Sequence, residues 1–288
     1  MGKKSMSGRK LTFLLITIPI VALFFCFNTL PLIKGVIYSF TNFKGYGSYD
    51  WVGLRNYKDL FTDSRVGGSY LFTFKLAIVA TLICVLIGYP TACFMGREGP
   101  SFQRVGMVLI MLPMWMNFLL RTYAWMSILE NHGFLNQILA LVGIGPLHII
   151  NTDAAVILGM VYNFLPFMIL PIFSVIEKLD RRYIEAAQDL GAGRVQVFRR
   201  VIFPLSVPGV ISGIMMVFIP SISTFAISKL LGGGMSFLLG DLIEMQFLGS
   251  AYNPHLGSAI SLMMLLLVII AMLIMNRFGD GEEGAVMM

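Results

Sequence analysis

Long apolar stretches dominate this chain and leave few folds open to it. Several of them run for about 20 residues with few or no charges, which is the length a helix needs to cross the hydrocarbon core of a bilayer. The chain is 57% hydrophobic, with a mean hydropathy of +0.81 over 288 residues, and this leaves little room for a separate soluble domain. The sequence therefore predicts an all-α protein that crosses the membrane several times.

Six stretches are expected to span the membrane. Lysine and arginine favour the cytoplasmic side, and 13 of the 21 basic residues fall in segments that this rule places inside. Both ends are then cytoplasmic, as tails at residues 1–10 and 277–288 around a transmembrane domain at 11–276. Only the first external loop, with five basic residues, opposes this topology. The expected spans cover residues 11–32, 71–94, 105–129, 154–176, 207–231 and 257–275, with a short amphipathic helix at 134–142 between the third and the fourth.

One polar segment, residues 177–204, interrupts the apolar pattern on the cytoplasmic side. It holds six of the 21 basic residues and four of the 15 acidic ones. Its pattern predicts helix–turn–helix: Asp180 is a favourable N-cap and Gly191 is placed to end the first helix in a left-handed conformation. A second helix is expected at 194–202, with Pro204 ending it. Composition alone favours a different interpretation, an interfacial basic loop that binds lipid headgroups.

The spacing within this segment matches a known sequence motif. Glu185, Ala186 and Ala187 are followed three residues later by Gly191, and nine residues after that comes Val-Ile-Phe-Pro204. This resembles the "EAA" loop of ABC importer permeases, EAA-x3-G-x9-I-x-L-P, with Val for Ile and Phe for Leu. The resemblance implies a type I ABC importer permease fold, and a loop that docks onto a cytoplasmic ATPase subunit.

A second resemblance concerns the cargo. The third span contains Trp115, Asn117 and Tyr123 in a Pro-Met-Trp-Met-Asn-Phe-Leu-Leu-Arg-Thr-Tyr run. This is similar to the spermidine/putrescine branch of these permeases, and most like the first of the two permease subunits of such a system. The resemblance implies a substrate path for polyamines through the bilayer.

The residues themselves permit such a path without requiring it. Trp115, Tyr123 and Trp125 can attract ammonium groups by cation–π contact, although an aromatic belt at the lipid interface explains the latter two as well. Asp241 and Glu244 can form an acidic outer vestibule or simply a solvated face. Arg121 would repel a polycation, so it is expected to pair structurally or to gate.

Other chemistry is not indicated. The three histidines are scattered, the three cysteines lie in apolar spans, and no metal-ligand spacing, catalytic constellation or phosphate-binding loop is apparent. The charge of +6 follows the membrane topology rather than suggesting a nucleic-acid partner. We therefore expect no catalytic residue, metal or cofactor in this chain, with ATP and Mg²⁺ bound by a separate ATPase.

The favoured function is the membrane-spanning subunit of an ATP-driven polyamine importer in a bacterial cell membrane. Its expected partners are a second permease, an ATPase dimer and an extracytoplasmic polyamine-binding protein. The alternatives are a permease for another small solute, or an ion-coupled secondary transporter. The last normally carries ionisable groups near the membrane midplane, whereas the acidic residues here lie outside the expected spans.

Overall fold

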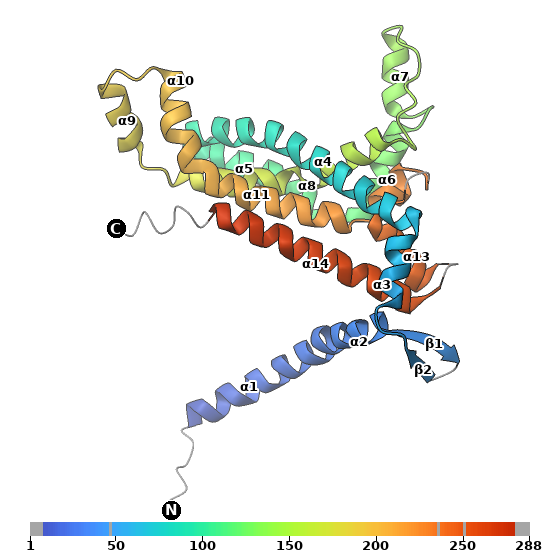
Figure 1. Cartoon of the computed structure of the whole chain (residues 1–288). Helices are drawn as coiled ribbons and strands as arrows, with labels where there is room; N and C mark the ends of the chain where they lie inside the picture. The colour runs from blue at the N-terminus through green and yellow to red at the C-terminus, as the bar shows by residue number, and fades with distance from the viewer. Residues whose placement is uncertain (1–7, 46–47, 235–236, 250–251, 280–288) are drawn as a thin grey trace, which may run out of the picture. The chain divides into compact units, whose positions relative to one another are not determined.

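The computed structural model describes residues 8–45, 48–234, 237–249 and 252–279, and these are mostly helical (Figure 1). The predicted tails at 1–10 and 277–288 lie largely outside the described residues. The chain divides into two compact units, residues 1–63 with 245–264, and residues 64–244 with 265–288. Each unit is described by itself.

The first unit begins with a continuous helical run that extends beyond the expected end of the first span. It consists of α1 (Gly8–Phe24), a π-helical turn η1 (Phe25–Thr29) and α2 (Leu30–Ser39). Pro31 falls in the first turn of α2, where a missing N–H is tolerated. The apolar span therefore ends near Ser39 and not near Leu32.

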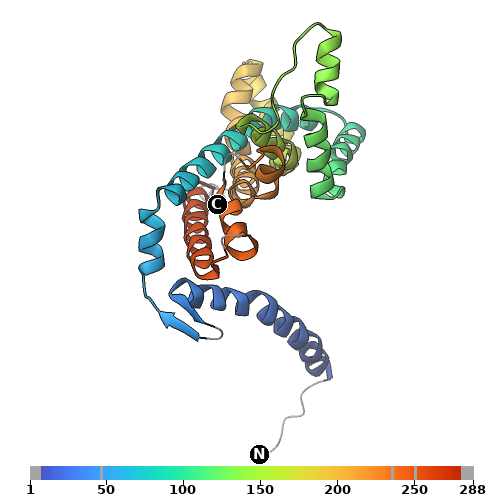
Figure 2. The same cartoon turned by 90° about the vertical axis from the view of Figure 1, so that its right-hand side faces the viewer.

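A β-hairpin follows α2, a departure from the purely helical expectation. Strands β1 (Thr41–Gly45) and β2 (Ser48–Trp51) pair antiparallel, with Thr41 opposite Trp51, beside the C-terminal end of α2 (Figures 1 and 2). Helix α3 (Arg55–Thr62) comes next. Its Asn56 side chain donates to the carbonyl oxygens of Ser39 and Thr41, at 2.9 and 3.0 Å, and so ties α3 to the start of the hairpin.

The second unit is a helical bundle whose core is built on α8 (Asp153–Glu177). Buried apolar side chains of α8 form one cluster with those of α4 (Ser64–Arg97), α11 (Phe203–Ser223) and α12 (Ala226–Leu231). Phe173 and Met168 of α8 are almost fully enclosed in it. The other helices of this unit outside residues 177–204 are α5 (Pro100–Trp115), α6 (Phe118–Leu129), α7 (Phe134–Leu141), α13 (Leu239–Leu248) and α14 (Pro254–Gly279), the last two being shared with the first unit.

Small residues let α11 approach α8 closely. A Cβ atom at Gly209 would lie 2.9 Å from the carbonyl oxygen of Pro171, and one at Gly213 would lie 3.1 Å from that of Met168. Both neighbours are backbone atoms, so only glycine fits without a shift of the helices. This is the close packing that small residues at i and i+4 allow in membrane helices.

Two expected spans are interrupted. The third is not one helix over 105–129, because α5 ends at Trp115 and α6 begins at Phe118, and the chain bends there by 91°. The fifth ends earlier than expected: α11 ends at Ser223, and α12 is a separate helix packed against α8.

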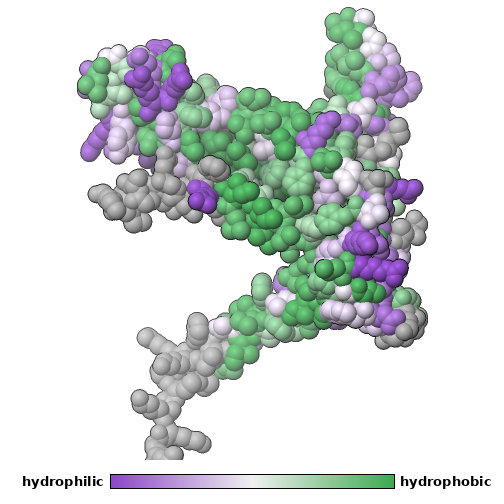
Figure 3. Space-filling view, in the orientation of Figure 1, coloured by the Kyte–Doolittle hydropathy of each residue, from purple (hydrophilic) through white to green (hydrophobic). Residues whose placement is uncertain are grey.

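The spans agree with a multi-pass membrane protein. Five described helical segments are long and apolar enough to cross a bilayer, and the bent pair of α5 with 118–141 makes a possible sixth. In Figure 3 apolar side chains cover α4 and α11, whereas polar side chains gather on α9 (Arg181–Asp189) and α10 (Arg194–Val197). The short helix expected at 134–142 is present as α7. The orientation of the chain in the membrane stays a prediction.

Candidate functional site

The polar segment at residues 177–204, called the EAA segment below, folds as the helix–turn–helix that its local sequence predicts. Helix α9 (Arg181–Asp189) begins at Asp180, whose carboxylate accepts a hydrogen bond from the Arg182 N–H at 3.0 Å. It ends at Asp189, two residues before Gly191, where φ is +81° and the Gly191 N–H donates to the Gln188 carbonyl oxygen at 2.8 Å. The cap and the left-handed glycine thus fix both ends of α9.

The second half of the segment departs from expectation at Pro204. Helix α10 (Arg194–Val197) leads into a π-helical turn η2 (Phe198–Ile202) and then directly into α11, so Pro204 does not end the helix. Within the turn the Phe203 N–H donates to the Phe198 carbonyl oxygen, five residues back. The wider π-helical turn accommodates a residue that lacks an N–H, and residues 194–223 form one continuous helical segment.

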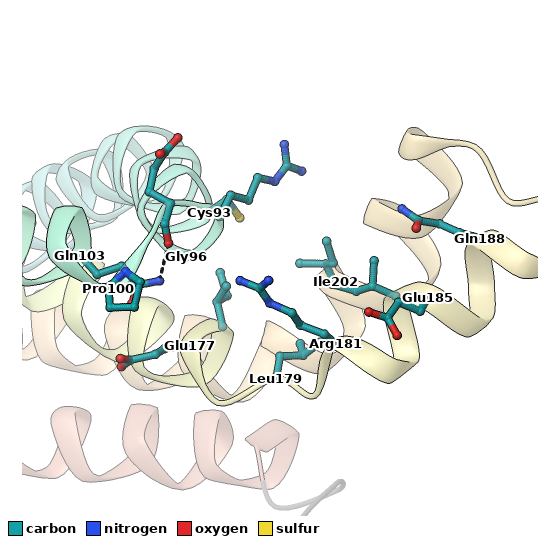
Figure 4. A pocket seen from close by; sticks show the side chains of 14 residues that line it. Cys93, Gly96, Pro100, Gln103, Glu177, Leu179, Arg181, Glu185, Gln188 and Ile202 are labelled. Atoms are coloured by element: carbon teal, nitrogen blue, oxygen red, sulfur yellow. Dashed lines mark hydrogen bonds between the residues drawn. The ribbon is translucent and has the colours of Figure 1, made fainter.

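A groove of about 480 Å³ lies between α9 and the ends of the membrane helices (Figure 4). Arg181 and Glu185, one turn apart on α9, line it from one side. Arg97 and Glu98, from the turn between α4 and α5, line it from the other. The groove therefore brings both signs of charge together at the place where α9 meets the membrane domain. Its remaining lining residues are Cys93, Gly96, Pro100, Gln103, Ile176, Glu177, Leu179, Ile184, Gln188 and Ile202.

The outer surface of the EAA segment is more apolar than a solvated loop requires. Glu185 and Ala186 are exposed and Ala187 is half-buried. Leu190 and Val195 are 88% and 78% exposed; Leu190 lies outside the candidate spans, and Val195 lies at the very start of the span that covers residues 194–223. Large exposed apolar side chains in an otherwise charged segment are typical of a protein-docking surface.

A polar contact ties this segment to the bundle. The Tyr89 hydroxyl of α4 lies 2.8 Å from Ser206 Oγ, in the first turn of α11. The Tyr89 ring packs edge-on against Phe198 and Phe203, with centroids 5.9 and 5.8 Å apart. The π-helical turn is therefore held directly against α4.

The predicted path residues of the third span lie around its break. Trp115 is the last residue of α5 and is exposed, and Asn117 caps α6 by accepting hydrogen bonds from the Leu119 and Leu120 N–H groups. The Arg121 guanidinium is buried and donates to the carbonyl oxygen of Pro113, on the other side of the break. Arg121 thus joins the two half-helices, the structural pairing expected for it.

The other two aromatic residues have different surroundings. Tyr123 is exposed, whereas Trp125 is half-buried and packs edge-on against Tyr162 of α8 at 5.1 Å. The Arg121 guanidinium lies 5.9 Å from the same Tyr162 ring. Trp125 is thereby engaged in a contact between helices, and its role in a substrate path stays a prediction, as does that of Tyr123.

Asp241 and Glu244 lie on one helix, α13, but differ in environment. Asp241 is only 7% exposed and accepts a hydrogen bond from the Leu238 N–H at 2.9 Å. Burial raises its pKa from 3.8 to about 6, against the opposing effects of its hydrogen bonds. Glu244 pairs with Lys229 of α12 at 2.8 Å, and this contact raises the Lys229 pKa. The pair therefore contains one buried and one ion-paired carboxyl.

The structure brings together residues that are far apart in the sequence. The turn at 97–98 faces α9, and Tyr162 faces the broken third span. Lys229 meets Glu244, and Tyr89 meets Ser206. The one sequence feature that marked the turn was its polarity between two apolar stretches; nothing local indicated which partner it would face.

Comparison with known proteins identifies the family. Residues 85–281 match the family described as binding-protein-dependent transport system inner membrane component. The spermidine/putrescine transport system permease protein PotB of Haemophilus influenzae is 40% identical over 87% of this chain and 88% of its own length. PotB of Escherichia coli strain K12 is 38% identical over 72% and 76%.

A solved structure agrees on the fold. A bacterial ABC transporter involved in the import of the acidic polysaccharide alginate superimposes with a TM-score of 0.75 at 16% identity, covering 95% of this chain and 96% of that one. At this identity the likeness concerns the fold alone. The family match over most of the chain and the identity to the two PotB permeases agree with this fold. This chain therefore belongs to the family of binding-protein-dependent transport system inner membrane components.

Proposed function

We propose that this chain is a membrane-spanning permease subunit of an ATP-driven importer for spermidine and putrescine. It is a transport subunit and not an enzyme, and it lies in the bacterial inner membrane. The observation that carries the cargo is the identity of 38–40% to PotB permeases. The observation that carries the transport mechanism is the exposed helix α9, held by caps at both ends and joined to the membrane bundle.

The partners follow from the same surface. An ATPase subunit docks on α9, with Leu190 and Val195 as apolar contacts and Glu185 as the charged one. A second permease completes the path, and an extracytoplasmic binding protein delivers the polyamine. ATP and Mg²⁺ are held by the ATPase dimer.

The helical geometry supplies the coupling. Residues 194–223 form one helical segment of 30 residues, which spans roughly 45 Å at 1.5 Å per residue. Movement of α9 when the ATPases close is passed through η2 to the far end of α11. Because Tyr89 of α4 contacts Ser206 of α11, α4 moves together with α11. Rigid-body motion of these helices switches the path between its outward-open and inward-open states.

The test is ATP hydrolysis by the purified complex, with and without the binding protein loaded with spermidine. The Glu185→Gln variant should lose most of the stimulation, by about tenfold or more, since one interfacial hydrogen bond to a charged group contributes about 1.5–3 kcal/mol. Asp189→Asn is the matched control, because Asp189 is exposed on the same helix but does not line the groove.

The possible results separate the parts of the proposal. If the ATPase co-purifies and spermidine gives no stimulation, the cargo is wrong and the coupling role stands. If no ATPase co-purifies under mild conditions, the secondary-transporter alternative is favoured. Equal loss in the two variants would contradict a specific role for Glu185.

A further inference from the structure

A second cavity, of about 420 Å³, lies within the first unit and has a different character from the groove beside α9. It sits at the C-terminal end of α2, which the charge pattern places outside the cytoplasm. Its wall combines the end of α2, the hairpin and the start of α14. The lining residues are Tyr38, Asn42, Phe43, Tyr49, Tyr252, Asn253, Pro254 and His255.

Aromatic rings dominate this cavity and surround one another at close range. The Tyr38 ring centroid lies 5.4 Å from that of Tyr49 and 5.0 Å from that of His255. Tyr49 and His255 are 5.5 Å apart. The hydroxyls of Tyr38 and Tyr49 lie 3.2 Å apart, which fixes the two rings relative to each other. Tyr252 adds a further, largely exposed ring to the wall.

The hydrogen bonds of His255 show which end of its ring accepts. Its Nδ1 lies 3.2 Å from the Tyr38 carbonyl oxygen, which can only accept, so Nδ1 carries the proton. The Thr41 hydroxyl, 3.1 Å from the same nitrogen, donates to the Ile37 carbonyl oxygen and so accepts from Nδ1. In the neutral ring Nε2 is therefore an acceptor. His255 itself is buried and held in place.

The electrostatic setting favours a cation. None of the eight lining residues is an aspartate, glutamate, lysine or arginine. The faces of the aromatic rings are therefore not covered by a lysine or arginine side chain of the cavity wall. The faces of aromatic rings carry negative potential, and so does the C-terminal end of α2. The N-terminal N–H groups of α14 oppose this, but Asn253 already accepts from two of them, at Leu256 and Gly257.

We propose that the cavity around Tyr38, Tyr49 and Tyr252 binds an alkylammonium group through the faces of its rings. A cage of several aromatic rings without a charge of its own is the arrangement by which proteins hold organic cations. Two sources carry this chemistry outside the membrane: a free polyamine and the ethanolamine headgroup of a phospholipid. The site does not rest on the polyamine cargo, because the headgroup carries the same group.

Ring-removing and ring-keeping variants test the cage directly. Binding of radiolabelled spermidine to the full chain is measured by equilibrium dialysis in a maltoside detergent, which has no ammonium group. The double variant Tyr49→Leu/Tyr252→Leu should bind about 5- to 30-fold more weakly, from two exposed cation–π contacts. The variant Tyr49→Phe/Tyr252→Phe keeps the ring faces and should stay close to the parent chain.

The controls guard against effects on folding. Trp51→Leu removes an exposed ring that stacks on Phe40 in the same unit and does not line the cavity, so binding should be unchanged. Tyr49 and Tyr252 are both exposed, which limits damage to the core. If the double variant fails to purify, each single leucine variant is measured alone.

A second arm distinguishes the two sources. The chain is stripped of lipid, and its retention of phosphatidylethanolamine is compared with that of phosphatidylglycerol by native mass spectrometry. Loss of spermidine binding in the leucine variant identifies the polyamine, and loss of selective phosphatidylethanolamine retention identifies the headgroup. Either result supports the cage.

The proposal is overturned if the leucine variant matches the parent in both arms, or if the phenylalanine variant loses as much as the leucine variant. These measurements use the chain alone. A failure of the ATP-hydrolysis test with spermidine would therefore leave the cage standing, and a failure here would leave the coupling role standing.

Discussion

The Tyr89 hydroxyl lies 2.8 Å from Ser206 Oγ and joins the C-terminal third of α4 to the first turn of α11. Ser206 also donates to the Phe203 carbonyl oxygen at 2.9 Å, so the Ser206 hydroxyl accepts from Tyr89. Both side chains are buried, and the Tyr89 ring covers the π-helical turn. This contact places the link between the coupling segment and the bundle at one defined point.

Removing the Tyr89 hydroxyl should weaken the contact between α4 and α11. Tyr89→Phe keeps the ring contacts and loses one buried hydrogen bond, which should lower the free energy of unfolding by about 1 kcal/mol. The thermal midpoint of the purified complex and its stimulated ATP hydrolysis should both fall. Tyr252→Phe, at an exposed position, is the stability control. An unchanged midpoint in Tyr89→Phe would show that this hydrogen bond contributes nothing.

Two neighbouring glycines give a matched test of the end of α9. A Cβ at Gly191 or Gly193 would meet no atom within 4 Å, but only Gly191 has a positive φ, +81°, against −68° for Gly193. Gly191→Ala should therefore weaken the turn by about 1–2 kcal/mol, whereas Gly193→Ala should be tolerated. Stimulated ATP hydrolysis should fall only in the first. Equal activity of the two variants would mean that the left-handed turn is not needed for coupling.

The buried carboxyl of Asp241 predicts a pH dependence of stability. Its folded pKa of about 6 lies above the ordinary 3.8, so the folded state holds this proton more tightly than the unfolded state. The resulting stabilisation is fully present below about pH 4 and is lost as the pH rises through about 6. Asp241→Asn keeps an oxygen for the Leu238 N–H and should remove this dependence.

The measurement for Asp241 is the thermal midpoint of each protein between pH 4 and pH 8. As the pH rises from 4 to 8, the free energy of unfolding of Asp241→Asn should increase relative to that of the parent by about 1–3 kcal/mol. Asp59→Asn, at an exposed carboxylate of α3, should run parallel to the parent. If the thermal midpoint of Asp241→Asn changes with pH as that of the parent does, burial does not raise the Asp241 pKa as proposed.

Local features of the sequence were sufficient for several elements. The apolar stretches predicted the spans because the length needed to cross a bilayer is a property of each stretch alone. Asp180 and Gly191 predicted both ends of α9 because capping involves groups within a few residues. The EAA spacing predicted the family for the same reason, since its residues lie on a single segment.

Contacts between residues distant in the sequence decided where helices break and where they continue. Arg121 bonds to Pro113 across a bend that no local rule for a Pro-containing span fixes, since such helices are often only kinked. Pro204 sits inside a helix because η2 widens the turn before it and Tyr89 supports that turn from another helix.

The same limit applies to charges and cavities. In the sequence Asp241 and Glu244 are equivalent acids, and only the packing around α13 buries one and leaves the other to Lys229. The aromatic cavity needs residues from 38 to 255 to meet. The sequence by itself determined which segments are apolar enough to cross the membrane and where α9 begins and ends. Tertiary structure decided where helices break, which charges are buried and which rings converge, because those outcomes depend on neighbours that the chain reaches only by folding.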